Sequence, residues 1–459
     1  MKTGKIITAW ILALVLAGLL AACTAKPDVK PEVSTEEAVP PAESTEEAAS
    51  LADSTEGSAA ATAASSAAAE TPETAAPSDT SKESDMALMA EVEGNNSYCV
   101  RVGDRIFYRI PAAGGMSAAA LFGEYQSTEC GPAELVSYDL TTGEEVHHLT
   151  DNAWGPMVIS GRFLFFNAGT GMGDTSENFT VCYDTKAPAA TEYKNYYLEG
   201  GDKQGRLAVL KTYGKEGIDL TVLEGDQLRY TGRPENYAEF YGIYADALYY
   251  RGEDERSSLY MLDIPSGKIV NLGKLPDGPE GSYGGELCQF AADEDGVYLS
   301  YGFYEGTGHF YASGFYVQAK PGVSDSISFE ESPASLQEEP TAPRPFAVAD
   351  GKMIPADGIP GSAALDYQSG ELSLFDESGK KEASLEGYAS VDDETGEKRV
   401  CVELVQAVAG KIYAVINLEH HVPQEDIGWR WAYEREESYA VLIDPVTGEE
   451  TQIGFTEHP

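Results

Sequence analysis

Basic residues are scarce in this chain. In 459 residues, 31 Lys and Arg stand against 76 Asp and Glu, a formal net charge of −45. Such a chain repels the phosphate backbone of nucleic acids, so we expect no nucleic-acid partner. Its acidity also favours solubility, and we expect a monomer.

Cysteine and histidine are equally rare, with six residues of each type and no CxxC or CxxH spacing. Five cysteines follow Cys23, an odd number, which argues against a complete disulfide framework. Cys99, Cys182 and Cys401 lie in apolar runs and are predicted to be small buried side chains. The paired histidines, such as His147 and His148, would point to opposite sides of a strand, so we predict no metal site and no cofactor.

Helical patterning is also lacking. After residue 92 no stretch combines an apolar stripe of helical period with capping residues. Short runs rich in Tyr, Phe, Val and Ile are instead bounded by Gly, Asp or Pro. These residues suit strands, and the frequent turns predict an all-β domain over residues 93–459.

The one long apolar run lies at the start of the chain. Lys2 and Lys5 precede an apolar segment from Ile6 to Leu20, and Leu20-Ala21-Ala22-Cys23 follows. This order is typical of a secretory signal, here residues 1–22. The last four residues resemble the lipobox of bacterial lipoproteins, which implies cleavage before Cys23 and a diacylglyceryl thioether with palmitate-type chains on it. The alternatives are an ordinary signal peptide, or a spanning helix, with a chance cysteine.

A lipid on Cys23 would hold the protein on the extracytoplasmic face of the cell membrane, and we expect a Gram-positive cell surface. Residues 23–92 are mostly Ala, Ser, Thr, Glu and Pro without an apolar period. Such a composition cannot bury enough apolar surface to offset its ordering entropy. We therefore expect a disordered linker between the anchor and the domain.

A short motif recurs along the domain, in which a small turn residue precedes an apolar and aromatic run. Its copies begin at seven positions that are 41 to 59 residues apart: Gly103, Gly161, Gly205, Asp246, Gly296, Gly351 and Gly410. Regular recurrence at about 50 residues is typical of repeat architectures.

A second motif follows the first in four copies: YDLTTGEEV from Tyr138, LDIPSGKIV from Leu262, LDYQSGELS from Leu365 and IDPVTGEET from Ile443. Its Asp can accept hydrogen bonds from backbone amides two residues on, and its Gly can adopt positive φ. We predict hairpin turns there, with a degraded copy from Asp184 to Pro188, and interpret these Asp residues as turn formers before ligands.

Each repeat then comprises two hairpins, and four strands repeated seven times predict a seven-bladed β-propeller, with six or eight blades as alternatives. The phrases AADEDGVYLSY (Ala291 to Tyr301) and LDIPSGKIV resemble the Tyr-rich extracellular propellers of bacterial surface lipoproteins, which are similar to propellers of low-density-lipoprotein-receptor-related proteins. The resemblance implies a fold and carries no catalytic residue across.

Strand alternation places both kinds of tight turn on one face of the ring and the longer second-to-third loops on the other. The predicted loops are residues 110–133, 167–178, 302–313 and 417–437. Recognition favours such loops on a rigid scaffold. The candidate ligand-binding residues are Tyr304, His309, Trp429, Trp431 and Tyr433; the alternative for the Trp pair is core packing.

We therefore expect a non-enzymatic, membrane-anchored module that binds an extracytoplasmic peptide, protein or glycan. The alternative is an extracellular propeller enzyme that acts on polysaccharide or uses a quinone as a dehydrogenase. No Ser-His-Asp set or carboxylate pair has a spacing that stands out, so no catalytic residue is predicted.

Overall fold

The computed structural model describes residues 92–111, 133–151, 153–169, 178–215, 217–253, 258–275, 282–305, 311–319, 327–328, 344–389, 391–392, 398–421 and 433–457. All of them belong to one compact unit, Pro77–Pro459. Every regular element in these ranges is a β-strand. Within the same ranges, no helix has the length and apolarity to cross a membrane.

The strands form eight described sheets, each antiparallel and in chain order, which we call A to H. Sheet A contains β1 (Val92–Glu93), β2 (Cys99–Val102), β3 (Arg105–Pro111), β4 (Ala133–Asp139) and β5 (Glu145–Asp151). Sheet B contains β6 (Ala153–Ser160), β7 (Phe163–Ala168), β8 (Phe179–Asp184) and β9 (Ala189–Lys194). Sheet C contains β10 (Tyr197–Gly201), β11 (Leu207–Gly214), β12 (Gly217–Glu224) and β13 (Gln227–Gly232).

Sheet D contains β14 (Tyr237–Tyr244), β15 (Ala247–Gly252), β16 (Ser258–Asp263) and β17 (Lys268–Lys274). Sheet E contains β18 (Ser282–Asp293), β19 (Gly296–Glu305), β20 (Tyr311–Ala319) and β21 (Ile327–Ser328). Sheet F contains only β22 (Phe346–Ala349) and β23 (Lys352–Pro355), and sheet G contains β24 (Ala363–Asp366), β25 (Glu371–Phe375) and β26 (Lys381–Leu385). Sheet H contains β27 (Val391–Asp392), β28 (Lys398–Val408), β29 (Lys411–His421), β30 (Tyr433–Ile443) and β31 (Glu450–Glu457).

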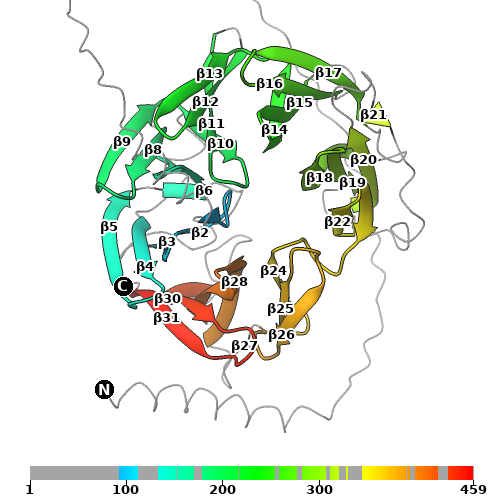
Figure 1. The fold of residues 1–459 in the computed structure, drawn as a ribbon. Coiled ribbons are helices and arrows are strands. Elements are labelled where there is room, and N and C mark those ends of the chain that lie inside the picture. Colours follow the sequence, from blue (N-terminus) through cyan, green and yellow to red (C-terminus); the bar gives the residue numbers. More distant parts are fainter. Residues whose placement is uncertain are drawn as a thin grey trace, which may run out of the picture. The chain divides into compact units, whose positions relative to one another are not determined.

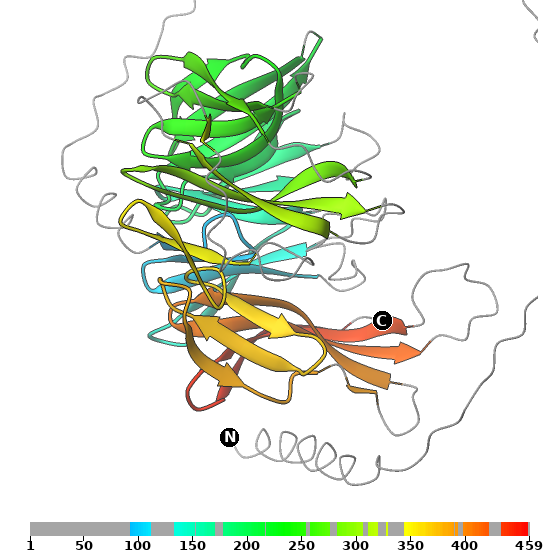
Figure 2. The ribbon, with the colours of Figure 1, turned by 90° about the vertical axis from the view of Figure 1, so that its right-hand side faces the viewer.

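The sheets are arranged around a central axis, as Figure 1 shows face-on and Figure 2 from the edge. Inner strands of neighbouring sheets contact one another: β2 with β6, β6 with β10, β10 with β14, β14 with β18, β18 with β22, β24 with β28, and β28 with β2. The prediction of an all-β, propeller-type repeat fold is confirmed.

Apolar side chains fill the spaces between neighbouring sheets. The seven described clusters join A with B, B with C, C with D, D with E, E with F, G with H, and H with A. The β-branched and aromatic residues of each strand suit these half-buried faces because alternate side chains pack against the two adjacent sheets. No cluster among the described residues joins F with G.

The ring closes between sheets H and A without exchange of a strand. The Gln406 side chain of β28 accepts hydrogen bonds from Cys99 N at 3.0 Å and Tyr98 N at 3.2 Å, and donates one to Cys99 O. Gln289 of β18 holds Phe346 in the same way, through bonds of 2.6 and 3.1 Å. A side-chain amide thus replaces backbone pairing at the junction between inner strands.

The segment between β1 and β2 reinforces this closure. Asn95 exchanges hydrogen bonds with the backbone of Ile159 in sheet B, and Asn96 with that of Gly201 in sheet C. Ser97 forms a β-bridge with Met157. Residues that precede the first full strand therefore connect sheet A to both B and C.

Both predicted turn motifs are confirmed. The seven copies of the first motif all lie at the start of the second strand counted from the inner strand, which is β2 in sheet A and β28 in sheet H; these second strands are β3, β7, β11, β15, β19, β23 and β29. In the second motif, Asp139, Asp263, Asp366 and Asp444 each accept a bond from the N–H of the Gly four residues on, through their own carbonyl. The Asp184 carboxylate accepts hydrogen bonds from Lys186 N and Ala187 N, as predicted for the degraded copy of this motif.

Two cysteine predictions are also confirmed. Cys99 and Cys182 are buried free thiols. Burial raises the pKa of both, that of Cys182 to about 12, so neither is a ready nucleophile. Cys401 is only half-buried, and Cys130 lies outside the described residues.

Candidate functional site

The two faces of the ring differ in chemistry. We call the face that carries the first-to-second and third-to-fourth turns the turn side, and the face at which first strands begin and second strands end the loop side. On the turn side, backbone N–H groups bind the carboxylates of Asp139, Asp366 and Asp444 and lower their pKa. Because the carboxylate oxygens are engaged by their own turns, we interpret these three Asp residues as turn formers and not as ligand-binding groups.

Most of the predicted ligand-binding residues lie outside the residues that the structure describes. This applies to His309, Trp429 and Trp431, and to Cys23 at the predicted anchor. Tyr433 is the first residue of β30 and pairs with His421. Tyr304 was placed in a loop by prediction, which is wrong: β19 continues to Glu305, and Tyr304 pairs with Tyr283 and Tyr311. The aromatic residues Tyr301, Phe303 and Tyr304 at this end of β19 suit a strand and favour extension of the hairpin.

The structure also differs from the sequence prediction in sheet C. Its second and third strands are joined by a tight connection, with Gly214 paired to Gly217, where the repeat pattern predicts a longer loop. Strands β11 and β12 therefore form a hairpin with a two-residue connection. The loop side of sheet C is consequently formed by strand ends themselves.

Described functional groups gather at this point. Glu199 of β10 forms an ion pair with Lys211 Nζ of β11 at 2.5 Å, and accepts a hydrogen bond from the Tyr237 hydroxyl of β14 at 2.6 Å. Burial lowers the pKa of Lys211, but the Glu199 charge outweighs it and the net shift is upward. Lys211 is therefore held in its charged form.

An aromatic surface covers this ion pair. Lys211 Nζ lies 5.6 Å from the centre of the Tyr213 ring, and Tyr197 packs edge-on against the same ring at 5.5 Å. Tyr213 is 58% exposed. We call Tyr197, Glu199, Lys211, Tyr213 and Tyr237 the Glu199 cluster. An exposed ring that packs against a partly buried ion pair is a preorganised contact for a ligand, because its position is set before binding.

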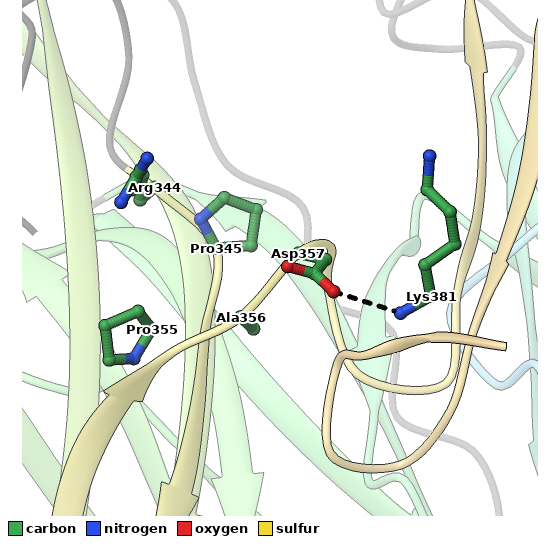
Figure 3. Close-up of a pocket in the computed structure, with 6 residues that line it drawn as sticks. All are labelled: Arg344, Pro345, Pro355, Ala356, Asp357 and Lys381. Atoms are coloured by element: carbon green, nitrogen blue, oxygen red, sulfur yellow. Dashed lines mark hydrogen bonds between the residues drawn. The ribbon is translucent and has the colours of Figure 1, made fainter.

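The second feature is an open pocket between sheets F and G, of about 410 Å³, shown in Figure 3. Its lining residues are Arg344, Pro345, Pro355, Ala356, Asp357 and Lys381. Lys381 N donates to Asp357 Oδ2 at 3.3 Å, while Lys381 Nζ forms an ion pair with Glu371 at 2.8 Å. The pocket thus presents basic side chains in a strongly acidic protein.

A Ser-His-Tyr chain lies between sheets A and B. His148 Nε2 is 2.8 Å from Ser137 Oγ, and His148 Nδ1 is 2.8 Å from the Tyr183 hydroxyl. Burial lowers the pKa of His148, and the positive charge of Arg105 lowers it further. Ser137 is fully buried, and His148 engages both its hydroxyl and that of Tyr183, so we interpret the chain as a structural link between sheets.

His147 confirms that the adjacent histidines face opposite ways, since it pairs with Glu134 and Glu145 at 2.9 Å each. Among the residues that the structure describes, no three His, Cys, Asp or Glu side chains gather as ligands for a metal ion. Asp293 accepts hydrogen bonds from Asp295 N and Gly296 N, which makes it a turn residue between β18 and β19.

Comparison with known proteins gives a fold and no family. No family model and no curated protein matches the chain. Solved structures that are similar include the β-propeller domain of the Trilobed protease from Pyrococcus furiosus, with 11% identity over 79% of this chain and 94% of that one, and a TM-score of 0.39. The acylaminoacyl peptidase of Pyrococcus horikoshii has 12% identity over 81% of this chain and 53% of its own, with a TM-score of 0.40. TolB from Acinetobacter baumannii has 10% identity over 69% and 62%, with a TM-score of 0.30.

Proposed function

We propose that this protein is a lipid-anchored surface binding module. In this proposal Cys23 carries the lipid, residues 23–92 connect it to the domain, and the ring binds an extracytoplasmic peptide, protein or glycan through its loop side. The Leu20-Ala21-Ala22-Cys23 sequence supports the anchor. The Glu199 cluster supports the binding face, and its exposed Tyr213 is the observation that carries it.

We also propose that the ring has seven blades, with sheets F and G as two parts of one blade. The support is the count of apolar clusters: seven clusters join consecutive sheets around the ring, and F and G share none. Their contact is instead made by loops, with Asp357 N bonded to Gly379 O at 2.8 Å and Gly361 N bonded to Asp376 O at 2.9 Å.

The binding face is tested with two tyrosine variants. A peptide and glycan array probed with the Cys23→Ser chain would identify a ligand, and its affinity would then be measured for Tyr213→Ser and Tyr367→Ser. Tyr367 is 66% exposed in a turn-side hairpin and serves as the matched control. We expect Tyr213→Ser to weaken binding about tenfold or more, a loss of about 1.4 kcal/mol, and Tyr367→Ser to leave it unchanged. Equal effects of both variants would contradict the loop-side assignment.

The anchor is tested separately. Cells that express the full chain would be labelled with palmitate and fractionated, with Cys23→Ser and Cys130→Ser side by side. We expect only the Cys23 variant to lose both the label and membrane association, because a thioether-linked lipid needs that thiol. Labelled Cys23→Ser protein in the membrane fraction would reject the lipoprotein assignment and leave the binding face untouched.

A further inference from the structure

Three cations occupy the same position in three repeats. Six first-to-second turns contain a residue with φ between 51° and 68°, among them Gly103, Gly205 and Ala245. The sixth residue after each of these three is Arg109, Lys211 and Arg251, respectively. All three lie near the ends of their second strands, on the loop side. The repeat thus provides an internal comparison in which backbone position is constant.

In two of the three repeats, a carboxylate from the adjacent first strand satisfies the cation. Lys211 pairs with Glu199 at 2.5 Å, and Arg251 pairs with Glu239 at 2.9 Å. In each case the Glu charge raises the pKa of the cation against the opposing effect of burial. These repeats show which chemistry the position accepts: a carboxylate oxygen beside a partly buried cation.

In the described part of sheet A and its neighbours, the cation has no carboxylate partner. Arg109 is 1% exposed and is among the largest fully buried side chains. Its Nη2 donates to Gly155 O, and its guanidinium carbon lies 5.7 Å from the centre of the Phe166 ring. Nε and Nη1 have no hydrogen-bond partner among the described residues.

A second buried donor is unpaired in the same region. The Tyr413 hydroxyl of β29 has no hydrogen-bond partner in the described part of the chain. Arg109 is close enough for its charge to act on this hydroxyl and oppose the rise in pKa that burial causes. Buried donors without an acceptor are costly and rare, and a charged one is the costliest. Two together indicate that an acceptor is supplied from outside the described chain.

We propose that Arg109 binds a carboxylate group of this protein's ligand at the loop side of sheets A and B. The carboxylate would accept from Nε or Nη1 of Arg109 and take the role that Glu199 and Glu239 have in the neighbouring repeats. The low-polarity surroundings strengthen this attraction relative to water. The inference rests on the proposed binding function and specifies one chemical group of the ligand.

The proposal predicts that replacing Arg109 and Lys211 by Met changes the unfolding temperature in opposite directions. Thermal unfolding of the full chain would be compared for Arg109→Met and Lys211→Met, without added anions and with chloride as the only salt. Arg109→Met removes an unpaired buried charge and should raise the unfolding temperature. Lys211→Met leaves Glu199 buried without its partner and should lower it. A lower unfolding temperature for both variants would overturn the proposal, because Arg109 would then be structural.

The ligand chemistry is tested with small anions at constant ionic strength: acetate, succinate and citrate, against inorganic phosphate and chloride. Binding to the folded state alone raises the unfolding temperature in a saturable way. We expect such a rise with at least one carboxylate for the wild type and for Arg251→Met, whose cation already pairs with Glu239, and none for Arg109→Met. No rise in the wild type, a rise that persists in Arg109→Met, or saturable binding of phosphate alone would each overturn the assignment. An array ligand that depends on Tyr213 but binds Arg109→Met normally would overturn this inference and leave the proposed function standing.

Discussion

The junction between sheets H and A and the junction between sheets F and G are built in opposite ways. H and A share a large apolar cluster that includes Tyr108, Tyr413 and Leu442. The Gln406 clamp and a bond from Ala409 N to Glu93 at 2.6 Å reinforce it. F and G share no described cluster, and loops and an open pocket lie between them.

The difference follows from chain connectivity. Strands β23 and β24 are joined by residues 356–362, so proximity of F and G costs little entropy. Sheets H and A lie at opposite ends of the domain, and their approach closes a loop of about three hundred residues, which costs more. We infer that the H–A junction depends on direct contacts because the chain itself supplies no link there.

The largest effect is expected from loss of the Gln406 clamp. Gln406→Ala removes the acceptor of Cys99 N, on a fully buried residue, and leaves Cys99 O with only the Ser97 hydroxyl at 3.2 Å; a buried group that loses its partner costs about 1–3 kcal/mol. We expect a loss of about 2–4 kcal/mol in the free energy of unfolding by urea. Gln368→Ala, in an exposed turn, is the control and should change stability by less than about 0.5 kcal/mol. A Gln406 variant as stable as this control would show that the apolar cluster alone closes the ring.

A smaller effect is expected from the segment between β1 and β2. Asn96 has φ of 67° and exchanges bonds of 2.9 and 2.5 Å with Gly201. Asn96→Gly keeps the backbone conformation and removes those bonds, so stability should fall by about 1–2 kcal/mol.

The matched control for Asn96 is Asn195→Gly, because Asn195 is exposed and has φ of 64°. Denaturant unfolding of both variants should separate the loss of side-chain bonds from the change in backbone freedom. Equal losses in the two variants would mean that Asn96 acts only through its φ angle.

The smallest effect is a local response to acid. Asp376 lies in the β25–β26 loop, which is hydrogen-bonded to the connector of residues 356–362, and bonds from the Ser378 hydroxyl and from backbone N–H groups lower its pKa. An Asp whose folded pKa is below the unfolded value of about 4 stabilises the fold above that pH, and the contribution disappears as pH falls through the folded pKa. The amides of the Gln406 clamp do not titrate in this range.

We therefore expect hydrogen exchange of residues 356–362 to accelerate, after correction for intrinsic rates, when pH falls from 5 to below 3. Residues 404–408 of β28 should stay protected over the same interval. Asp376→Asn should abolish the difference between pH values, since the side chain no longer titrates. Earlier loss of protection in β28 would reverse the order of strength that we assign to the two junctions.

Sequence patterns sufficed for the repeated local elements. The Asp-to-Gly turns and the seven second-strand starts depend on residues within a few positions, so their hydrogen bonds follow from local chemistry. Loop lengths were harder to predict: β19 extends through Tyr304, and the connection after Gly214 is tight, because cross-strand pairing decides where a strand ends. No local pattern distinguishes Gln406 from other glutamines, since its partners are Cys99 and Tyr98 at the other end of the domain.

The candidate site shows the same division. Strand alternation alone is the basis for proposing the loop side as the binding face, and the recurring motifs contain Arg109, Lys211 and Arg251. Only the tertiary structure showed that Lys211 and Arg251 have carboxylate partners and that Arg109 has none among the described residues. Turn type and strand alternation are set by neighbouring residues, whereas the pairing of a buried charge is set by side chains that folding brings together.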